Sequence, residues 1–263
     1  MYEFCFESYG VGVSLECDDL DVYRRSVEVI HRSLLGNLST IKKEKAGHHF
    51  KILSKKSGLY MELDGEMLSD GGPVNLFYSY FDSWLRLVVA EHAKDLVFLH
   101  CGAVAINGKG ILFPGDSFAG KTTLVAALVR GGATYYSDEY AILDADGLLQ
   151  PFARPLAIRD RIDHSIRTDT LATSLGGKIG VGKIPITAVM FFHYERNARL
   201  NPKLLTIGEG IMKILPQAIP LRFNSEFTVS VLNKMGECVT FLESKRGSVE
   251  SSAPKIKLLI DKL

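Results

Sequence analysis

The sequence has few of the features that mark secreted or membrane-spanning proteins. Its four cysteines are scattered along the chain, without the close spacing of metal or redox motifs, so neither a disulfide framework nor a structural zinc site is expected. No uninterrupted apolar run approaches the roughly 18 residues that a membrane span needs. The first ten residues, MYEFCFESYG, also lack the basic start and apolar block of a secretory signal. We therefore expect a cytoplasmic protein with no membrane partner.

An excess of charge of one sign is missing as well. Thirty-one Lys and Arg residues stand against 30 Asp and Glu residues, which gives a net charge of +1. The lysine runs at 42–45 and 55–56 are short and resemble solvated turns, so we expect no nucleic-acid partner. Apolar residues, in contrast, make up 46% of the chain and aromatic residues 10%. That content is sufficient for a folded core.

The length of 263 residues and a change of texture near residue 95 predict two domains, 1–95 and 96–263. The first part combines short strand-like runs with two stretches, 21–35 and 74–94, whose apolar residues recur at helical spacing. We expect a smaller α+β region there, and the sequence does not indicate its role.

The second part consists mainly of short Val/Ile/Leu-rich strands. Residues 96–106 and 110–114 flank Asn107-Gly108, a dipeptide that favours the positive φ angles of a type I′ hairpin turn. A helix is expected over 122–130, ending at a glycine pair. The polar, glycine-rich stretch 159–183 predicts a long mobile loop. Its part 176–183 either closes over the acceptor or is only a flexible connector.

The strongest motif covers residues 115–122 and matches G-x-x-x-x-G-K-[ST] at every fixed position. It follows an apolar strand and opens an apolar helix, an arrangement in which backbone N–H groups converge on phosphate oxygens. We predict that it binds ATP or another nucleoside triphosphate with Mg²⁺; the alternative is a glycine-rich turn with a surface lysine. The expected binding residues are Gly115, Asp116, Ser117, Phe118, Ala119, Gly120, Lys121, Thr122 and Thr123.

A phosphate loop of this kind needs a carboxylate nearby. Asp138 and Glu139 directly follow the strand-like run 133–136, and strand tips are where ligands gather in open α/β sheets. One carboxylate could hold Mg²⁺ while the other deprotonates a hydroxyl; a solvated acidic turn is the alternative. His100, on an apolar strand, is equally consistent with a core residue and with a functional one.

The order of these motifs resembles that of HPr kinase/phosphorylase and of its shorter relatives, serine kinases of which some modify small metabolites or peptide precursors. The resemblance covers about residues 96–160. It implies an α/β fold with a P-loop kinase core of the HPr kinase and phosphoenolpyruvate carboxykinase type, in which helices flank a mixed sheet. Kinases of this family often form oligomers, so a homo-oligomer is a further expectation. The residues that carry the resemblance are Leu99 to Ile106, Gly110 to Phe113, the phosphate loop, Arg130 to Ala133 and Ser137 to Glu139.

The resemblance also implies roles for single residues. Asp138 takes the place of the carboxylate that accepts the proton of the acceptor serine, and His100 matches a histidine near it. Arg159 ends a segment similar to one in the family, but the residues after it lack the family's glycine, which argues against the reverse, phosphorylase reaction. The expected catalytic set is Asp138, His100, Lys121 and Arg159, and the expected Mg²⁺ ligands are Thr122, Asp138 and Glu139.

These inferences predict an ATP-dependent kinase that transfers the γ-phosphoryl group to a serine-type hydroxyl of a protein, peptide or small molecule. Thr122 and Glu139 stand where the family usually has Ser and Asp. Those departures keep open a second function, a catalytically weak nucleotide-binding module that regulates a partner. A nucleoside triphosphatase that drives a conformational cycle is the third.

Overall fold

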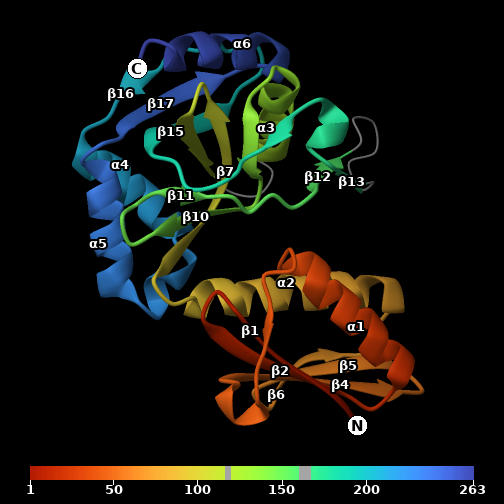
Figure 1. Ribbon diagram of the computed structural model, residues 1–263. Helices are drawn as coiled ribbons and strands as arrows, with labels where there is room; N and C mark the ends of the chain where they lie inside the picture. Colours follow the sequence, from red (N-terminus) through yellow and green to blue (C-terminus); the bar gives the residue numbers. More distant parts are fainter. Residues whose placement is uncertain (116–119, 160–166) are drawn as a thin grey trace. The chain divides into compact units, whose positions relative to one another are not determined.

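A computed structural model describes residues 1–115, 120–159 and 167–263 and separates the chain into two units, Met1–Lys94 and Asp95–Leu263 (Figure 1). Both units combine helices with sheet, and the architecture is mixed α/β. None of the helices in the described ranges has the length and apolarity that a bilayer crossing demands.

The first unit is built on a six-stranded sheet in the order β3-β1-β2-β4-β5-β6. The pair β2–β4 is parallel and every other neighbouring pair is antiparallel. Helix α1 (Leu20–Ser33), capped by the Asp19 side chain, packs on β1 and β2, and α2 (Val74–His92) packs on β5. The strands are β1 (Tyr2–Ser8), β2 (Val11–Cys17), β3 (Ser39–Thr40), β4 (His48–Lys55), β5 (Gly58–Leu63) and β6 (Glu66–Asp70), with a 3₁₀ turn at Lys43–Lys45.

The second unit is built on a nine-stranded mixed sheet. Its main path is β11-β10-β7-β8-β15-β17-β16, and β9 links β14 to β7. Strands β8, β15 and β17 run parallel to one another, so their carboxyl ends lie at one edge of the sheet. The strands are β7 (Leu96–Ile106), β8 (Lys109–Pro114), β9 (Thr134–Ser137), β10 (Tyr140–Asp144), β11 (Leu149–Gln150), β14 (Lys178–Ile179), β15 (Ile186–Tyr194), β16 (Lys203–Leu204) and β17 (Thr240–Arg246).

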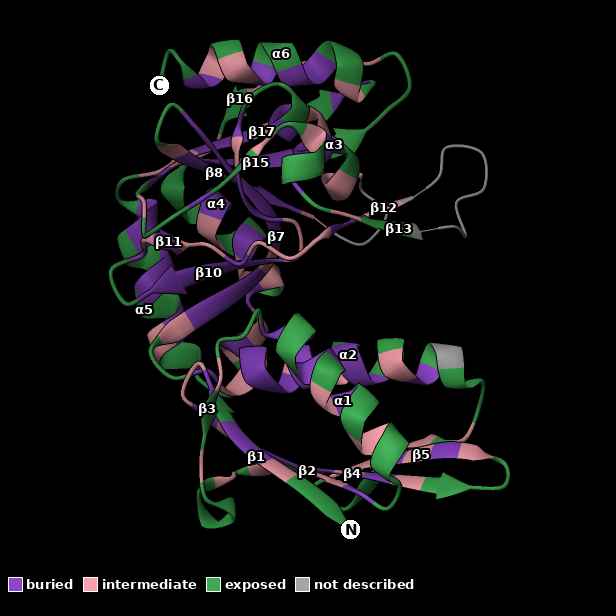
Figure 2. Cartoon of the chain, turned by 45° about the vertical axis from the view of Figure 1, so that its right-hand side comes forward, coloured by how far each residue is buried: buried purple, intermediate pink, exposed green. Residues whose placement is uncertain are grey.

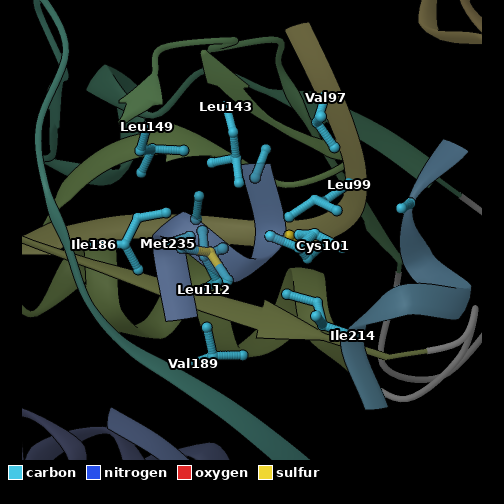
Figure 3. Close-up of a cluster of buried hydrophobic side chains, with 14 of the residues drawn as sticks. Val97, Leu99, Cys101, Leu112, Leu143, Leu149, Ile186, Val189, Ile214 and Met235 are labelled. Carbon is cyan, nitrogen blue, oxygen red and sulfur yellow. The ribbon is translucent and has the colours of Figure 1, made fainter. Parts of the chain in front are cut away.

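Helices cover both faces of this sheet, and its strands are largely buried (Figure 2). Apolar residues of α3 (Lys121–Arg130) and α6 (Val249–Ile260) fill one face. Those of α4 (Ile207–Ile214) and α5 (Ser225–Gly236) fill the other, where Ile214 and Met235 lie in the cluster drawn in Figure 3. A separate pair, β12 (Leu156–Arg159) and β13 (Arg167–Thr170), forms a two-stranded sheet. Further 3₁₀ turns lie at Thr173–Leu175, Leu215–Gln217 and Ile219–Arg222.

Strand β7 shows how the sequence assigns side chains to these faces. Leu99, Cys101 and Ala103 pack with α4 and α5, while Val104 packs with α3. Because successive side chains of a strand point to opposite faces, His100 and Gly102 lie on the α3 face. The expected hairpin of β7 and β8 is confirmed: Asn107 and Gly108 both have positive φ, +52° and +79°.

The expectation of one long mobile loop over residues 159–183 is wrong for its described residues. Residues 167–170 form β13, a 3₁₀ turn follows, and β14 adds to the edge of β9 with Ile179 opposite Tyr135. The glycines allow close packing here: a Cβ at Gly177 would lie 2.2 Å from Val129, and one at Gly180 would lie 2.4 Å from the Tyr136 ring. At these two positions, glycine therefore allows the backbone to approach a side chain closely.

Candidate active site

The phosphate-loop motif begins at the end of β8 and finishes at the first residues of α3. Gly115 has φ +156° and Gly120 has φ +76°, values that glycine adopts without the steric penalty of a Cβ. Gly120 is the N-cap of α3, and its carbonyl accepts the first bond of the helix, from the Leu124 N–H at 3.1 Å. Four of the expected binding residues, Asp116, Ser117, Phe118 and Ala119, lie outside the described residues.

Lys121 connects the two ends of the motif by a hydrogen bond. Its ammonium group donates a hydrogen bond to the Gly115 carbonyl, six residues back along the chain. The side chain therefore folds back toward the start of the loop, on the side of the helix N-terminus. Thr122 follows and is half-buried, whereas Thr123 is exposed to solvent. The first turn of α3 thus brings one cation and one inward-facing hydroxyl to the carboxyl edge of the parallel strands.

Asp138 lies between β9 and β10, which pair with the same edge of β7. Ser137 is opposite Ala103 and Tyr140 is opposite His100, so the unpaired residue Asp138 faces Gly102. The buried Ser137 hydroxyl shapes this break by accepting the N–H groups of Glu139 at 3.3 Å and of Tyr140 at 3.1 Å. The register puts Asp138 on the α3 face, the side on which Thr122 and Lys121 lie.

The Asp138 carboxyl has an unusual environment. Burial raises its pKa to about 7, partly offset by the nearby Thr122 hydroxyl as a hydrogen-bond donor; Glu139 raises the pKa further and Lys121 lowers it. Within the described part of the chain, Oδ1 is buried and has no hydrogen-bond partner. A buried acceptor without a partner costs on the order of 1–3 kcal/mol. Such a group is a candidate for contact with a metal ion or a substrate proton.

Glu139 points to a different partner. Its Oε2 accepts a hydrogen bond from Nη1 of Arg154 at 3.3 Å, and the Arg154 carbonyl in turn accepts the Tyr135 hydroxyl at 2.7 Å. The structure thus brings Glu139 beside Asp138 in the chain while its carboxylate contacts Arg154. Of the two adjacent acids, Asp138 is the one turned toward the first turn of α3.

His100 is half-buried on the α3 face of β7. Its ring lies edge-on to Tyr140, with ring centres 6.4 Å apart. Since Asp138 faces Gly102, His100 is two residues along the same strand on the same face, the diagonal position in which cross-strand side chains approach. The sequence expectation that His100 and Asp138 are neighbours therefore fits the register. Arg159 ends β12, opposite Arg167 of β13, and its side chain lies outside the described part.

No group of three His, Cys, Asp or Glu side chains suited to a metal ion occurs in residues 1–115, 120–159 and 167–263. The donors that do lie together are the Thr122 hydroxyl and the Asp138 carboxyl, both hard oxygen ligands. Mg²⁺ in nucleotide sites is held by one or two protein oxygens and completed by phosphates and water. The donor set therefore fits Mg²⁺ that arrives with a nucleotide.

One residue at this edge was missed in the sequence. The Arg246 side chain, at the end of β17, is 3% exposed, and its Nη2 donates to the Gly120 carbonyl at 3.0 Å. Nothing local in the sequence singles out this arginine. A basic residue at the carboxyl end of a strand parallel to the one that carries the motif is the signal that could have found it.

Comparison with known proteins finds similar solved structures but no matching family or curated protein. Among solved structures, the chain is similar to the HPr(Ser) kinase/phosphatase from Coxiella burnetii, with 14% sequence identity over 63% of this chain and 94% of that one. The TM-score is 0.36, a distant likeness that by itself supports no statement about activity.

Proposed function

We propose that this protein is a nucleotide-dependent phosphotransferase that moves the γ-phosphoryl group of ATP to a hydroxyl group. The observation that carries the proposal is the Asp138 carboxyl, whose pKa lies at about 7 and whose buried oxygen is unpaired within the described part, beside Thr122 and Lys121 of a glycine-capped helix. A general base is most effective when its pKa lies near the operating pH.

The nucleotide phosphates would bind at the N-terminus of α3. The positive end of the helix and the backbone N–H groups of its first turn favour anions there. Lys121 would exchange the Gly115 carbonyl for a phosphate oxygen, which is a stronger acceptor for an ammonium group. We extend the binding loop to Asp116, Ser117, Phe118 and Ala119 on the sequence motif alone. Thr123 is exposed on the first turn of α3 and would lie at the edge of the phosphate site.

Mg²⁺ would be held by the Thr122 hydroxyl directly and by the Asp138 carboxylate through a water molecule, because direct ligation would lower the pKa of the base. When bound, the ion supplies neutralisation of the phosphate charge. Glu139 is the less direct candidate, because its carboxylate already contacts Arg154. Its charge still acts on Asp138 by raising the pKa of that carboxyl. In this proposal Glu139 mainly tunes Asp138.

In the proposed transfer step, every bond change and the proton can be assigned. The acceptor hydroxyl oxygen forms a bond to the γ phosphorus, the bond from that phosphorus to the bridging oxygen breaks, and the nucleoside diphosphate leaves. The hydroxyl proton passes to Asp138, with His100 on the same face of the sheet next to it. Arg159 is proposed, on its resemblance to the family position, to approach the transferring group. Little covalent chemistry falls to the protein, so charge and positioning dominate.

The test uses ATP labelled at the γ phosphate, Mg²⁺, and a serine-containing peptide pool, a metabolite pool or cell lysate as acceptor. We expect label in an acceptor with wild-type protein, and a loss of at least a hundredfold in Asp138→Asn, which mimics the protonated acid. Asp146→Asn is the matched control, because Asp146 is an exposed residue of the β10–β11 turn, paired with Lys234.

The other two functions give different products in the same assay. Release of free phosphate without a labelled acceptor would indicate a nucleoside triphosphatase. Binding of Mg-ATP with no product after long incubation would indicate a regulatory module. Transfer at the wild-type rate by Asp138→Asn would remove the proposed base.

A further inference from the structure

Arg246 occupies a defined place relative to the phosphate loop. Strand β15 pairs in parallel with β8 on one side and with β17 on the other, and Tyr194 at the end of β15 is directly opposite Arg246. The motif leaves the end of β8 at the same edge. The sheet therefore brings a residue 126 positions away from Gly120 in sequence to the end of the loop.

The guanidinium of Arg246 is held by several contacts. Nη2 donates to the Gly120 carbonyl at 3.0 Å, and Nη1 donates to the Gly247 carbonyl at 3.3 Å. Its central carbon lies 5.8 Å from the centre of the Tyr194 ring, within the range of a cation–π contact. With 3% of the residue exposed, this planar fork has little freedom to move.

The contact fixes the direction of one peptide group. The Gly120 carbonyl lies between Arg246 Nη2 and the Leu124 N–H, and in a planar trans peptide the following N–H points the opposite way. That N–H belongs to Lys121, the lysine of the phosphate motif. Arg246 and the Leu124 N–H together hold this carbonyl, and they therefore orient the Lys121 amide before any ligand arrives.

Glycine at position 120 is required by the same contact. A Cβ at Gly120 would come within 2.5 Å of Arg246 Nη2, closer than real Cβ contacts, and φ is +76°. The glycine of the motif thus serves both the left-handed turn and the approach of the guanidinium. Gly120 and Arg246 therefore depend on each other, although they belong to different elements.

We infer that Arg246 is a positioning residue for polyphosphate binding, which helps to preset the Lys121 amide and places a buried positive charge at the Gly120 carbonyl. The inference rests on the proposed function. Its ligand class is the phosphate chain of a nucleoside triphosphate, independent of the base. A preset amide binds an anion without the cost of reorienting the peptide group.

The test measures binding by calorimetry with two probes, Mg-ATP and inorganic tripolyphosphate, which lacks the base and the sugar. For Arg246→Met we expect at least a tenfold rise in Kd for both probes, and for Arg246→Lys, which keeps the charge and one donor, a smaller rise. Lys245→Met is the control: Lys245 is the preceding residue of β17 and makes an exposed ion pair with Glu195. Its Kd values should stay within twofold of wild type.

If Arg246 only stabilised the fold, its replacement would change the Tm but not the response of the Lys121 amide to the ligand. In ¹⁵N-lysine-labelled protein we expect tripolyphosphate to shift the Lys121 amide resonance strongly in wild type and weakly in Arg246→Lys, even where the Tm of the two proteins without ligand is equal. If Arg246→Met does not fold, Arg246→Lys decides. Wild-type affinity and an unchanged Lys121 shift in Arg246→Lys overturn the inference while the proposed function stands; failure of wild-type protein to bind either probe overturns both.

Discussion

Val125 of α3 lies directly against the backbone of Gly102 in β7, so that a Cβ built on Gly102 would be 2.7 Å from Val125 Cγ2. Gly102 is also the residue that Asp138 faces across the strand edge. The absence of a side chain at position 102 therefore lets α3, with Lys121 and Thr122 in its first turn, approach the sheet next to the acid. One glycine governs the spacing of the candidate site.

The first prediction concerns that spacing. Gly102→Ala should lower the free energy of unfolding by about 1–3 kcal/mol, because the added methyl group overpacks the contact with Val125. Urea denaturation measures the loss. The double variant Gly102→Ala with Val125→Ala should be more stable than the sum of the two single changes predicts, by about 0.5–3 kcal/mol, since the second change makes room for the first. Strict additivity would show that the cost of Gly102→Ala does not come from the contact with Val125.

The second prediction concerns the pH dependence of stability through Asp138. Its carboxyl has a pKa of about 7 in the folded state and 3.8 as the ordinary value, so folding favours the protonated form. This contribution is complete below pH 4 and disappears as pH rises toward 7. Relative to wild type, Asp138→Asn should therefore gain stability between pH 4 and pH 7. The full shift corresponds to about 4 kcal/mol, and for a half-buried side chain we expect about 2 kcal/mol.

The measurement is the difference in unfolding free energy between Asp138→Asn and wild type, at pH 4.5, 6 and 8 and at constant ionic strength. Each value comes from urea denaturation. A difference that stays constant across this range would show that the carboxyl titrates alike in the folded and unfolded chain. That result would contradict the proposal that Asp138 is a base with a pKa near neutral pH.

Local signals in the sequence were sufficient for the elements that lead into the site. Asn107-Gly108 specified the hairpin of β7 and β8 because the turn needs two consecutive positive φ angles, and these two residues supply them. The helix expected over 122–130 is present as α3, Lys121–Arg130. Both depend on residues that are neighbours in sequence.

Pairing between strands that are far apart in the sequence could not be predicted from such local signals. Strand β14 forms because Ile179 pairs with Tyr135, and no local sequence pattern predicts a partner so far away in sequence. Likewise, Arg246 reaches Gly120 only because β17 is parallel to β15 and β15 to β8. Sequence periodicity indicates that a strand exists, but it does not indicate which strand lies beside it.

The third prediction uses two glycines of helix α4 that differ in what surrounds them. A methyl group at Gly208 would meet no heavy atom within 4 Å, whereas a Cβ at Gly210 would lie 2.1 Å from the ring of Phe241. Gly208→Ala should stabilise the protein by up to about 1 kcal/mol through helix propensity. Gly210→Ala should destabilise it by about 1–3 kcal/mol through overpacking against β17. Thermal unfolding of the two variants gives the comparison, and shifts of equal sign would contradict the packing of α4.

The last prediction concerns the first unit, where a buried cluster joins α1 to α2. Asp82, 8% exposed, accepts hydrogen bonds from the Ser33 hydroxyl and from Arg86, whose Nη2 is 2.9 Å from Oδ2. Asp82→Ala removes the carboxylate from Arg86, whereas the Ser33 hydroxyl keeps the Val29 carbonyl, 2.6 Å away, as an acceptor. We expect a loss of about 3–5 kcal/mol, because a buried charge is left with weaker compensation. Asp21→Ala, at an exposed site of α1, should cost less than about 1 kcal/mol.

The single tryptophan of the chain makes this change visible in one unit. Trp84 lies in α2, so its fluorescence reports on the first unit, whereas the candidate nucleotide site belongs to the second. In urea, the fluorescence transition of Asp82→Ala should move to lower concentration, and a later far-UV circular dichroism transition should remain. Mg-ATP should raise only that later transition, since a ligand stabilises the unit that binds it. Coincident transitions that shift together would instead show that residues 1–94 and 95–263 unfold as one cooperative body.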